Sequence, residues 1–354
     1  MLRRPYVSLL LLIPLFAILF DGCLEIETTS RVNSDGTIHR TVVIKGDSAA
    51  IHLGNFPLPL DSSWDREIQK SDDKKFILTA TRLFRDADEM SEALKGTTGK
   101  TLGIRVELHR QFQWFFTTLR YRETWLNFDP FRMVPVTDYL SPTELDFFIS
   151  HELSKEPYPT RGDSLAGKDA SERFEKWYTA NLFEAYYQNF MDGVKMLNDP
   201  SLTPSSVAAV KDKLCEKCMP LYFEKNKIDT LELIFRSVLK TPAVQKAMAA
   251  NSEGFKDFMA RLRFVDGVTE NSYQSNIIMP GLIIRTNASA LDGSKASWKD
   301  YIKFSLLRDT DLEVESRVTN WWAIFATGVV VVALLVLLIA TTLRRRRVIQ
   351  TQAP

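Results

Sequence analysis

The spacing of apolar and polar residues marks the first part of the chain as β structure. In the segment Thr37–Ile44, one face carries Ile38, Arg40, Val42 and Ile44 and follows the turn cluster 33–36. Two β-prone segments on either side of Asp-Gly predict a hairpin. Apolar residues recur at period two again from Ile104 to Phe116. This spacing predicts a long half-buried strand that pairs with 121–128.

After residue 140 the apolar spacing becomes helical. The run Ser141-Pro142-Thr143-Glu144 predicts a capped helix start, and the pairs Thr203-Pro204 and Thr241-Pro242 repeat it. A longer helix is expected to open near Asp169. Its apolar stripe comprises Phe174, Trp177, Tyr178, Leu182, Phe183, Tyr186, Tyr187, Phe190, Val194 and Leu197. From Ser272 the β pattern returns, with expected strands at 277–278, 282–284 and 301–307, and residues 312–318 lead into the C-terminal apolar run.

A long uncharged run lies near the C-terminus. Residues 321–340 contain no charged side chain, begin with Trp321 and Trp322, and are followed by the basic cluster Arg344, Arg345, Arg346 and Arg347. About 20 apolar residues span a bilayer core of ~30 Å. Tryptophans favour the membrane interface, and arginines mark the cytoplasmic side. The run therefore predicts a single-pass protein of the cytoplasmic (inner) membrane with most of the chain extracytoplasmic.

The N-terminus has the pattern of a secretory signal. Arg3 and Arg4 precede the apolar segment 6–20, and Gly22 and Cys23 follow it. A small residue before a cysteine is typical of bacterial lipoprotein signals, so Cys23 is a candidate lipidation site. Cleavage without lipid, or an uncleaved anchor, are the alternatives.

These patterns together predict an α+β protein. Residues 1–22 are the expected signal peptide, and 23–140 with 268–320 form a discontinuous, antiparallel, β-rich extracytoplasmic domain. Residues 141–267 are an all-helical insertion, 321–343 one transmembrane helix, and 344–354 a basic cytoplasmic tail.

Charge argues against nucleic acid as a partner. Of 45 basic and 44 acidic side chains, six basic and one acidic lie outside residues 24–320, which leaves that part with a net charge of −4. Nucleic-acid binding needs a clustered positive surface instead.

The remaining cysteines, Cys215 and Cys218, are a candidate disulfide in an oxidising compartment. A redox or metal role is the alternative, although one CxxC supplies too few ligands for zinc.

Candidate catalytic motifs are incomplete. The run 96–101 ends like a phosphate-binding loop, but the loop's first glycine would stand at Leu94. The helix motif of zinc proteases begins at His151, but Lys155 replaces its second histidine. Asp86, Asp88 and Glu89 fit the acidic first turn of a helix. We therefore expect no enzyme, no metal and no cofactor. The many aromatic residues indicate either core packing or a groove for an acyl chain.

Two segments resemble the LppM-type bacterial envelope lipoproteins. The first is Gly22–Glu27 with Val32–Thr37; the second is Met279-Pro280-Gly281 and Asn287-Ala288 with Trp298. The resemblance implies a lipidated envelope protein in contact with lipids, and it implies no catalytic residues. The helical insertion departs from that pattern.

The expected function is that of a membrane-anchored extracytoplasmic protein that binds a lipid or protein partner without catalysis. The alternative is a structural or assembly subunit of a membrane complex that docks through the helical insertion. An envelope enzyme is the third hypothesis.

Overall fold

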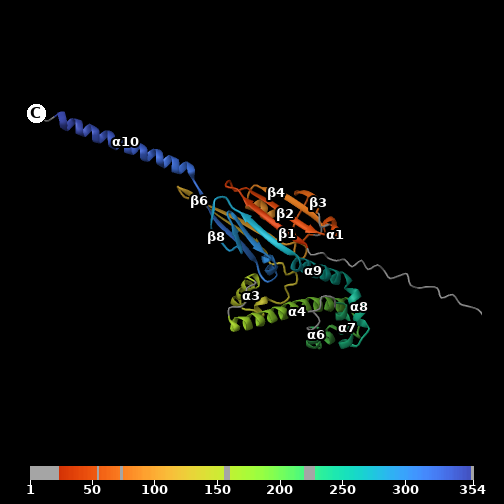
Figure 1. Ribbon diagram of the computed structural model, residues 1–354. Helices are drawn as coiled ribbons and strands as arrows, with labels where there is room; N and C mark the ends of the chain where they lie inside the picture. The colour runs from red at the N-terminus through yellow and green to blue at the C-terminus, as the bar shows by residue number, and fades with distance from the viewer. Residues whose placement is uncertain (1–23, 54–55, 72–74, 155–159, 219–227, 352–354) are drawn as a thin grey trace, which may run out of the picture.

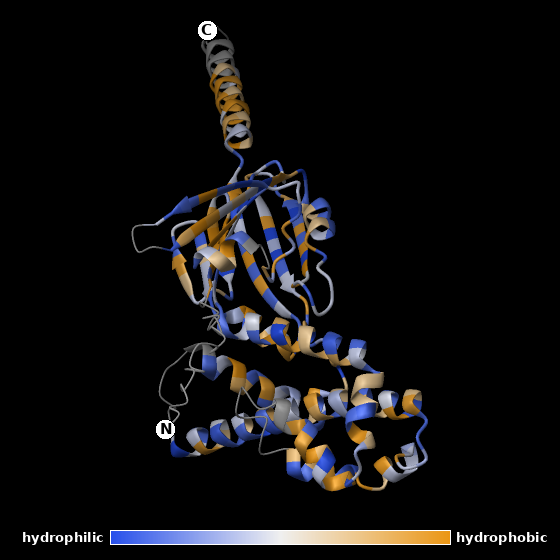
Figure 2. Cartoon of the chain, turned by 90° about the vertical axis from the view of Figure 1, so that its right-hand side faces the viewer, coloured by the Kyte–Doolittle hydropathy of each residue, from blue (hydrophilic) through white to orange (hydrophobic). Residues whose placement is uncertain are grey.

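The computed structural model describes residues 24–53, 56–71, 75–154, 160–218 and 228–351. The strands form two sheets that face each other, and the helices α3 to α9 lie beyond one end of the sheets (Figure 1). A long helix, α10 (Trp321–Thr351), projects from the opposite end (Figure 2). The predicted α+β class, with antiparallel-rich sheets and an apolar C-terminal helix, is confirmed.

The first sheet joins segments from both ends of the ectodomain. Its strand order is β3 (Asp65–Lys70), β4 (Phe76–Phe84), β2 (Ile38–Gly46), β1 (Glu25–Val32), β7 (Ser272–Ile278), β10 (Lys295–Lys299) and β9 (Ala290–Asp292). Neighbours are antiparallel except β1 and β7, which run parallel. The predicted hairpin is β1–β2, and Gly36 in its turn has a φ of +100° that favours glycine.

The second sheet has the order β5 (Ile104–Phe112), β6 (Phe116–Trp125), β11 (Thr310–Thr319) and β8 (Leu282–Thr286). The expectation of one strand from Ile104 to Phe116 is wrong. The chain reverses at residues 113–115, where Gln113 and Phe116 exchange backbone hydrogen bonds of 2.8 and 3.2 Å. The expected strand at 301–307 is also wrong, because Tyr301–Leu306 forms a 3-10 helix, η3.

The core of the sandwich lies between the two sheets. Alternate residues of every central strand are buried there, because successive side chains of a strand point to opposite faces. They include Ile26, Ile38, Ile44, Leu78, Ala80, Val106, Leu119, Trp125, Tyr273, Ile277, Trp298, Leu312 and Val314. Two short helices, α1 (Ser48–Leu53) and α2 (Ala87–Ala93), pack against strands of this sandwich.

The helical segments pack around α4. They are η1 (Val136–Asp138), α3 (Pro142–Ser154), α4 (Arg161–Leu197), α5 (Pro204–Ala208), α6 (Lys211–Cys218), α7 (Ile228–Leu239), α8 (Ala243–Ala250) and α9 (Ser252–Glu270). The long helix begins earlier than expected from Asp169, because Thr160 Oγ1 caps it by accepting from the backbone N–H of Asp163.

One glycine sets the approach of α8 to α4. A Cβ at Gly193 would lie 2.2 Å from the carbonyl oxygen of Ala247. The aromatic stripe of α4 fills the space between the helices, and the rings of Phe190 and Phe235 lie 4.8 Å apart in an edge-to-face arrangement.

Candidate functional site

The helix α10 contains a segment, Trp321–Thr341, that is long and apolar enough to cross a membrane. Its 21 residues extend ~32 Å at 1.5 Å per residue, and only 6% of the apolar window is buried in the protein. The predicted interface residues Trp321 and Trp322 lie in its first turn, and residues 344–347 continue the same helix. Figure 2 shows hydrophobic residues all around this helix.

Asn320 is the single residue between β11 and α10. Its side-chain Nδ2 donates to the carbonyl oxygens of Gln113 and Trp114 at 2.8 and 3.3 Å, and its Oδ1 accepts from Thr117 Oγ1 at 3.0 Å. Its backbone N–H donates to the carbonyl of Phe115 at 2.9 Å. The start of α10 is therefore bound to the β5–β6 turn rather than joined to the sandwich by a free segment.

Aromatic rings extend this junction. The ring of Trp322 stacks on Phe112 at 6.2 Å and meets Trp114 edge-on at 5.5 Å. The indole Nε1 of Trp114 donates to Thr327 Oγ1 at 2.8 Å. The sequence predicted the tryptophan pair of α10 but not its partners in the hairpin. The apolar residues at 112, 114 and 116 were the available signal, but they were assigned to a strand core.

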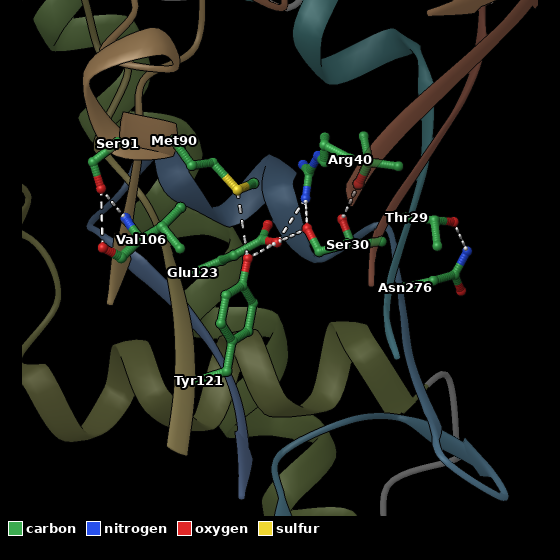
Figure 3. A network of polar contacts seen from close by, with 11 residues as sticks. Thr29, Ser30, Arg40, Met90, Ser91, Val106, Tyr121, Glu123 and Asn276 are labelled. Atoms are coloured by element: carbon green, nitrogen blue, oxygen red, sulfur yellow. Dashed lines mark hydrogen bonds and ion pairs between the residues drawn. The ribbon is translucent and has the colours of Figure 1, made fainter. Parts of the chain in front are cut away.

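A second polar cluster lies inside the sandwich, between β1, β2 and β6 (Figure 3). Arg40 Nη1 donates to Glu123 Oε1 at 2.6 Å and to Ser30 Oγ at 2.5 Å. The same Glu123 oxygen accepts from Ser30 Oγ at 2.5 Å and from the Tyr121 hydroxyl at 2.8 Å. All four side chains are at most 1% exposed. We refer to Ser30, Arg40, Tyr121 and Glu123 as the buried tetrad.

The tetrad ties the two sheets together, because Ser30 and Arg40 belong to one sheet and Tyr121 and Glu123 to the other. Burial, with the Glu123 charge as a lesser cause, raises the pKa of Tyr121 well above its ordinary value. Arg40 Nε and Glu123 Oε2 have no hydrogen-bond partner among the described residues. Such a closed cluster offers no side chain to an external substrate, so its role is structural.

The two helical cysteines are free thiols on α6. Cys218 is buried, and burial raises its pKa to about 12. Burial also raises the pKa of Cys215. Both effects favour the protonated thiol, which is a poor nucleophile and a poor metal ligand. The disulfide stays a prediction. Cys23 lies outside the described residues, and its lipidation likewise stays a prediction.

The remaining sequence candidates do not converge. His39, His52 and His109 are exposed on β2, α1 and β5. Asp86 caps α2 by accepting from the backbone N–H of Glu89. Among the described residues, no group of three or more His, Cys, Asp or Glu side chains gathers as in a metal site.

The aromatic stripe of α4 is mostly core, because Trp177, Phe183 and Phe190 are at most 2% exposed. One hollow beside it, lined by residues that include Phe131, Met133 and Arg261, has a volume of about 150 Å³. Sites for drug-sized ligands are typically about 300–1,000 Å³. This hollow is therefore too small for a lipid acyl chain with its headgroup.

No family model and no curated protein matches the chain. Among solved structures, the NMR structure of the folded domain of LppM from Mycobacterium tuberculosis is similar. The match has 8% identity, covers 85% of this chain and 94% of that chain, and has a TM-score of 0.28. At this score it supports at most a weak fold resemblance and carries no argument about function.

Proposed function

We propose that the chain is a membrane-anchored extracytoplasmic protein of the bacterial envelope that binds a partner without catalysis. The observation that supports this most is the junction at Asn320, where an exposed apolar helix continues directly from β11. Trp321 and Trp322 suit the outer interface, and the arginines that follow suit the cytoplasmic side. The chain would then cross the cytoplasmic membrane once, with its C-terminus inside and Cys23 as its lipid attachment point.

Protease treatment of intact spheroplasts tests this orientation. With an epitope tag after Pro354, we expect protease to remove the ectodomain and leave a small protected fragment that carries the tag. A matched variant with Arg344–Arg347 replaced by Gln should lose part of this protection, because the positive residues bias orientation. An ectodomain that stays intact until the cells are lysed would overturn the proposal.

Labelling with a palmitate analogue tests the lipid anchor separately. Wild-type chain should take up label, and a Cys23→Ala variant should not. Equal labelling of both would contradict lipidation at Cys23 and leave the orientation test unaffected.

A second candidate function is docking of an envelope protein to the helical segments. These segments lie at the end of the sandwich opposite to α10, so an anchored chain would hold them away from the bilayer (Figure 2). They expose the apolar side chains of Leu165, Met196 and Leu233, each of which is at least 60% accessible to solvent. A photocrosslinker at Met196 should give one discrete protein adduct in intact cells. Adducts solely with other copies of this chain, or no adducts at all, would argue against docking at this surface.

A further inference from the structure

The turn between β5 and β6 presents an unusual set of side chains to the outside. Phe112, Trp114 and Phe115 are 56%, 51% and 47% exposed, although large aromatic side chains are normally buried. We refer to residues Phe112–Phe115 as the hairpin tip. The rings of Phe112 and Trp114 contact that of Trp322, and the neighbouring rings of Trp321 and Phe325 on α10 are also exposed.

The hairpin tip lies alongside the helix rather than above it. Thr327, which accepts the indole N–H of Trp114, is six residues after Trp321, or ~9 Å along the helix axis. The apolar segment is ~32 Å long in total, and a bilayer core is ~30 Å thick. If α10 spans the membrane with this segment centred on the core, the indole of Trp114 therefore lies roughly 8 Å inside the level where headgroups meet acyl chains.

The last carbonyls and the indole N–H of the hairpin tip are bonded within the protein. Its three last carbonyls, at Gln113, Trp114 and Phe115, all accept from Asn320. The Trp114 N–H donates to Thr327 Oγ1, which in turn donates to the carbonyl of Ala323 at 2.7 Å. A turn in water needs no such partners, whereas a turn in contact with lipid does, because unbonded polar groups cost several kcal/mol there.

Charge around the hairpin tip also suits a membrane. No acidic residue occurs between Glu107 and Glu123, whereas Arg110 is exposed close to the tip. On the neighbouring strand β11, Glu315 is paired with Arg120 at 3.2 Å, and Arg317 is exposed over the ring of Phe116. Long basic side chains near an interface extend their charged ends to the headgroups.

We propose that the hairpin tip is a second membrane contact, inserted past the headgroups into the outer part of the acyl chains beside the first two turns of α10. The sandwich would then stand on the membrane at two adjacent points with a fixed orientation. This inference rests on the proposed anchoring by α10, and the experiment below separates the two.

The test places p-benzoylphenylalanine at one position of the full chain, which is reconstituted in nanodiscs of phosphatidylethanolamine and phosphatidylglycerol with alkyne-tagged acyl chains. Phe115 reports on the hairpin tip, Val331 on the middle of the apolar segment, and Leu233 on an exposed apolar residue of α7 remote from α10. After irradiation, lipid adducts are quantified and their attachment carbon is located by mass spectrometry.

We expect acyl-chain adducts at Phe115 and Val331, with a yield at Phe115 roughly tenfold or more above that at Leu233. Adducts at Val331 with Phe115 no better than Leu233 would overturn the hairpin contact and leave the anchor in place. Absence of adducts at both positions would overturn the anchor and the hairpin contact together. An additional Asn320→Ala substitution should lower the Phe115 yield and leave the Val331 yield unchanged; equal loss at both would contradict the contact.

Discussion

The buried tetrad makes a quantitative prediction about stability. Glu123→Leu would leave the guanidinium of Arg40, which is 1% exposed, with Ser30 as its remaining partner in the cluster. Removing one member of a buried ion pair typically costs about 3–5 kcal/mol, because the other charge stays desolvated and unpaired. Arg40→Met should cost a similar amount for the same reason, since Glu123 would keep only the hydroxyls of Ser30 and Tyr121.

The double variant should behave differently. Replacing both charges by apolar side chains removes the desolvation cost of the pair. Hydrogen bonds within the tetrad offset this cost only in part, because Arg40 Nε and Glu123 Oε2 lack partners among the described residues. The hydroxyls of Ser30 and Tyr121 then lose their acceptor, at about 1 kcal/mol each. We therefore expect the double variant to be more stable than either single variant by about 2 kcal/mol or more.

The assay must report on the sandwich alone, because the helical segments can unfold separately. Hydrogen exchange of peptides from β2 and β6, followed by mass spectrometry on the detergent-solubilised chain at increasing guanidinium chloride, gives this local free energy. Lys75→Met is the matched control. It removes an exposed ion pair with Glu25, 2.9 Å long, and should cost less than ~1 kcal/mol. Purely additive effects of the two tetrad substitutions would refute the reasoning.

Three further outcomes follow from local geometry. Gly193→Ala should destabilise the helical segments by about 1–3 kcal/mol in thermal unfolding, because its Cβ would meet the Ala247 carbonyl at 2.2 Å; an unchanged Tm would contradict this close approach. At pH 8, Cys218 should react with iodoacetamide on the order of a thousandfold more slowly than free cysteine, since burial raises its pKa to about 12. Mass spectrometry of timed samples measures this rate, and alkylation as fast as that of free cysteine would contradict the burial of the thiol. The hydrogen bonds from Arg173 and then Ser141 lower the pKa of Glu144 from 4.5 to about 2. The stabilising effect of the Glu144 carboxylate is therefore present above pH 4.5 and is lost as the pH falls toward 2. An NMR titration measures the pKa of Glu144. A wild-type pKa that stays near 4.5, or a pKa that does not rise in Arg173→Gln, would contradict the pairing.

Local patterns predicted much of the fold. The β1–β2 hairpin has a strong turn sequence, and the cap at Ser141 and the uncharged segment of α10 are also local signals. The pairing of β1 with β7 left no such signal, because Thr28 and Ser275 are 247 residues apart along the chain. The division of the strands into two sheets has no local signal for the same reason.

The sequence indicated only one part of the candidate site, the tryptophan pair at the start of α10. Trp321 and Trp322 were found because they flank an uncharged run. The hairpin tip was assigned to a continuous strand, since period-two spacing of apolar residues persists through residues 112–116 without Gly or Pro to mark a turn. Arg40 stood in an otherwise apolar strand face, which was a usable sign of a buried charge, but its partner Glu123 is 83 residues away and belongs to the other sheet.

The parallel pairing of β1 with β7 has a consequence for biosynthesis. The first strand leaves the ribosome long before its neighbour, and at ~5–20 residues per second the interval for 247 residues is about 12–50 s. During this interval one edge of the β1–β2 hairpin has no partner strand, and unpaired edges promote aggregation. If the chain is exported as proposed above, we expect a holding chaperone or the translocation channel to protect this edge until residues 272–278 arrive.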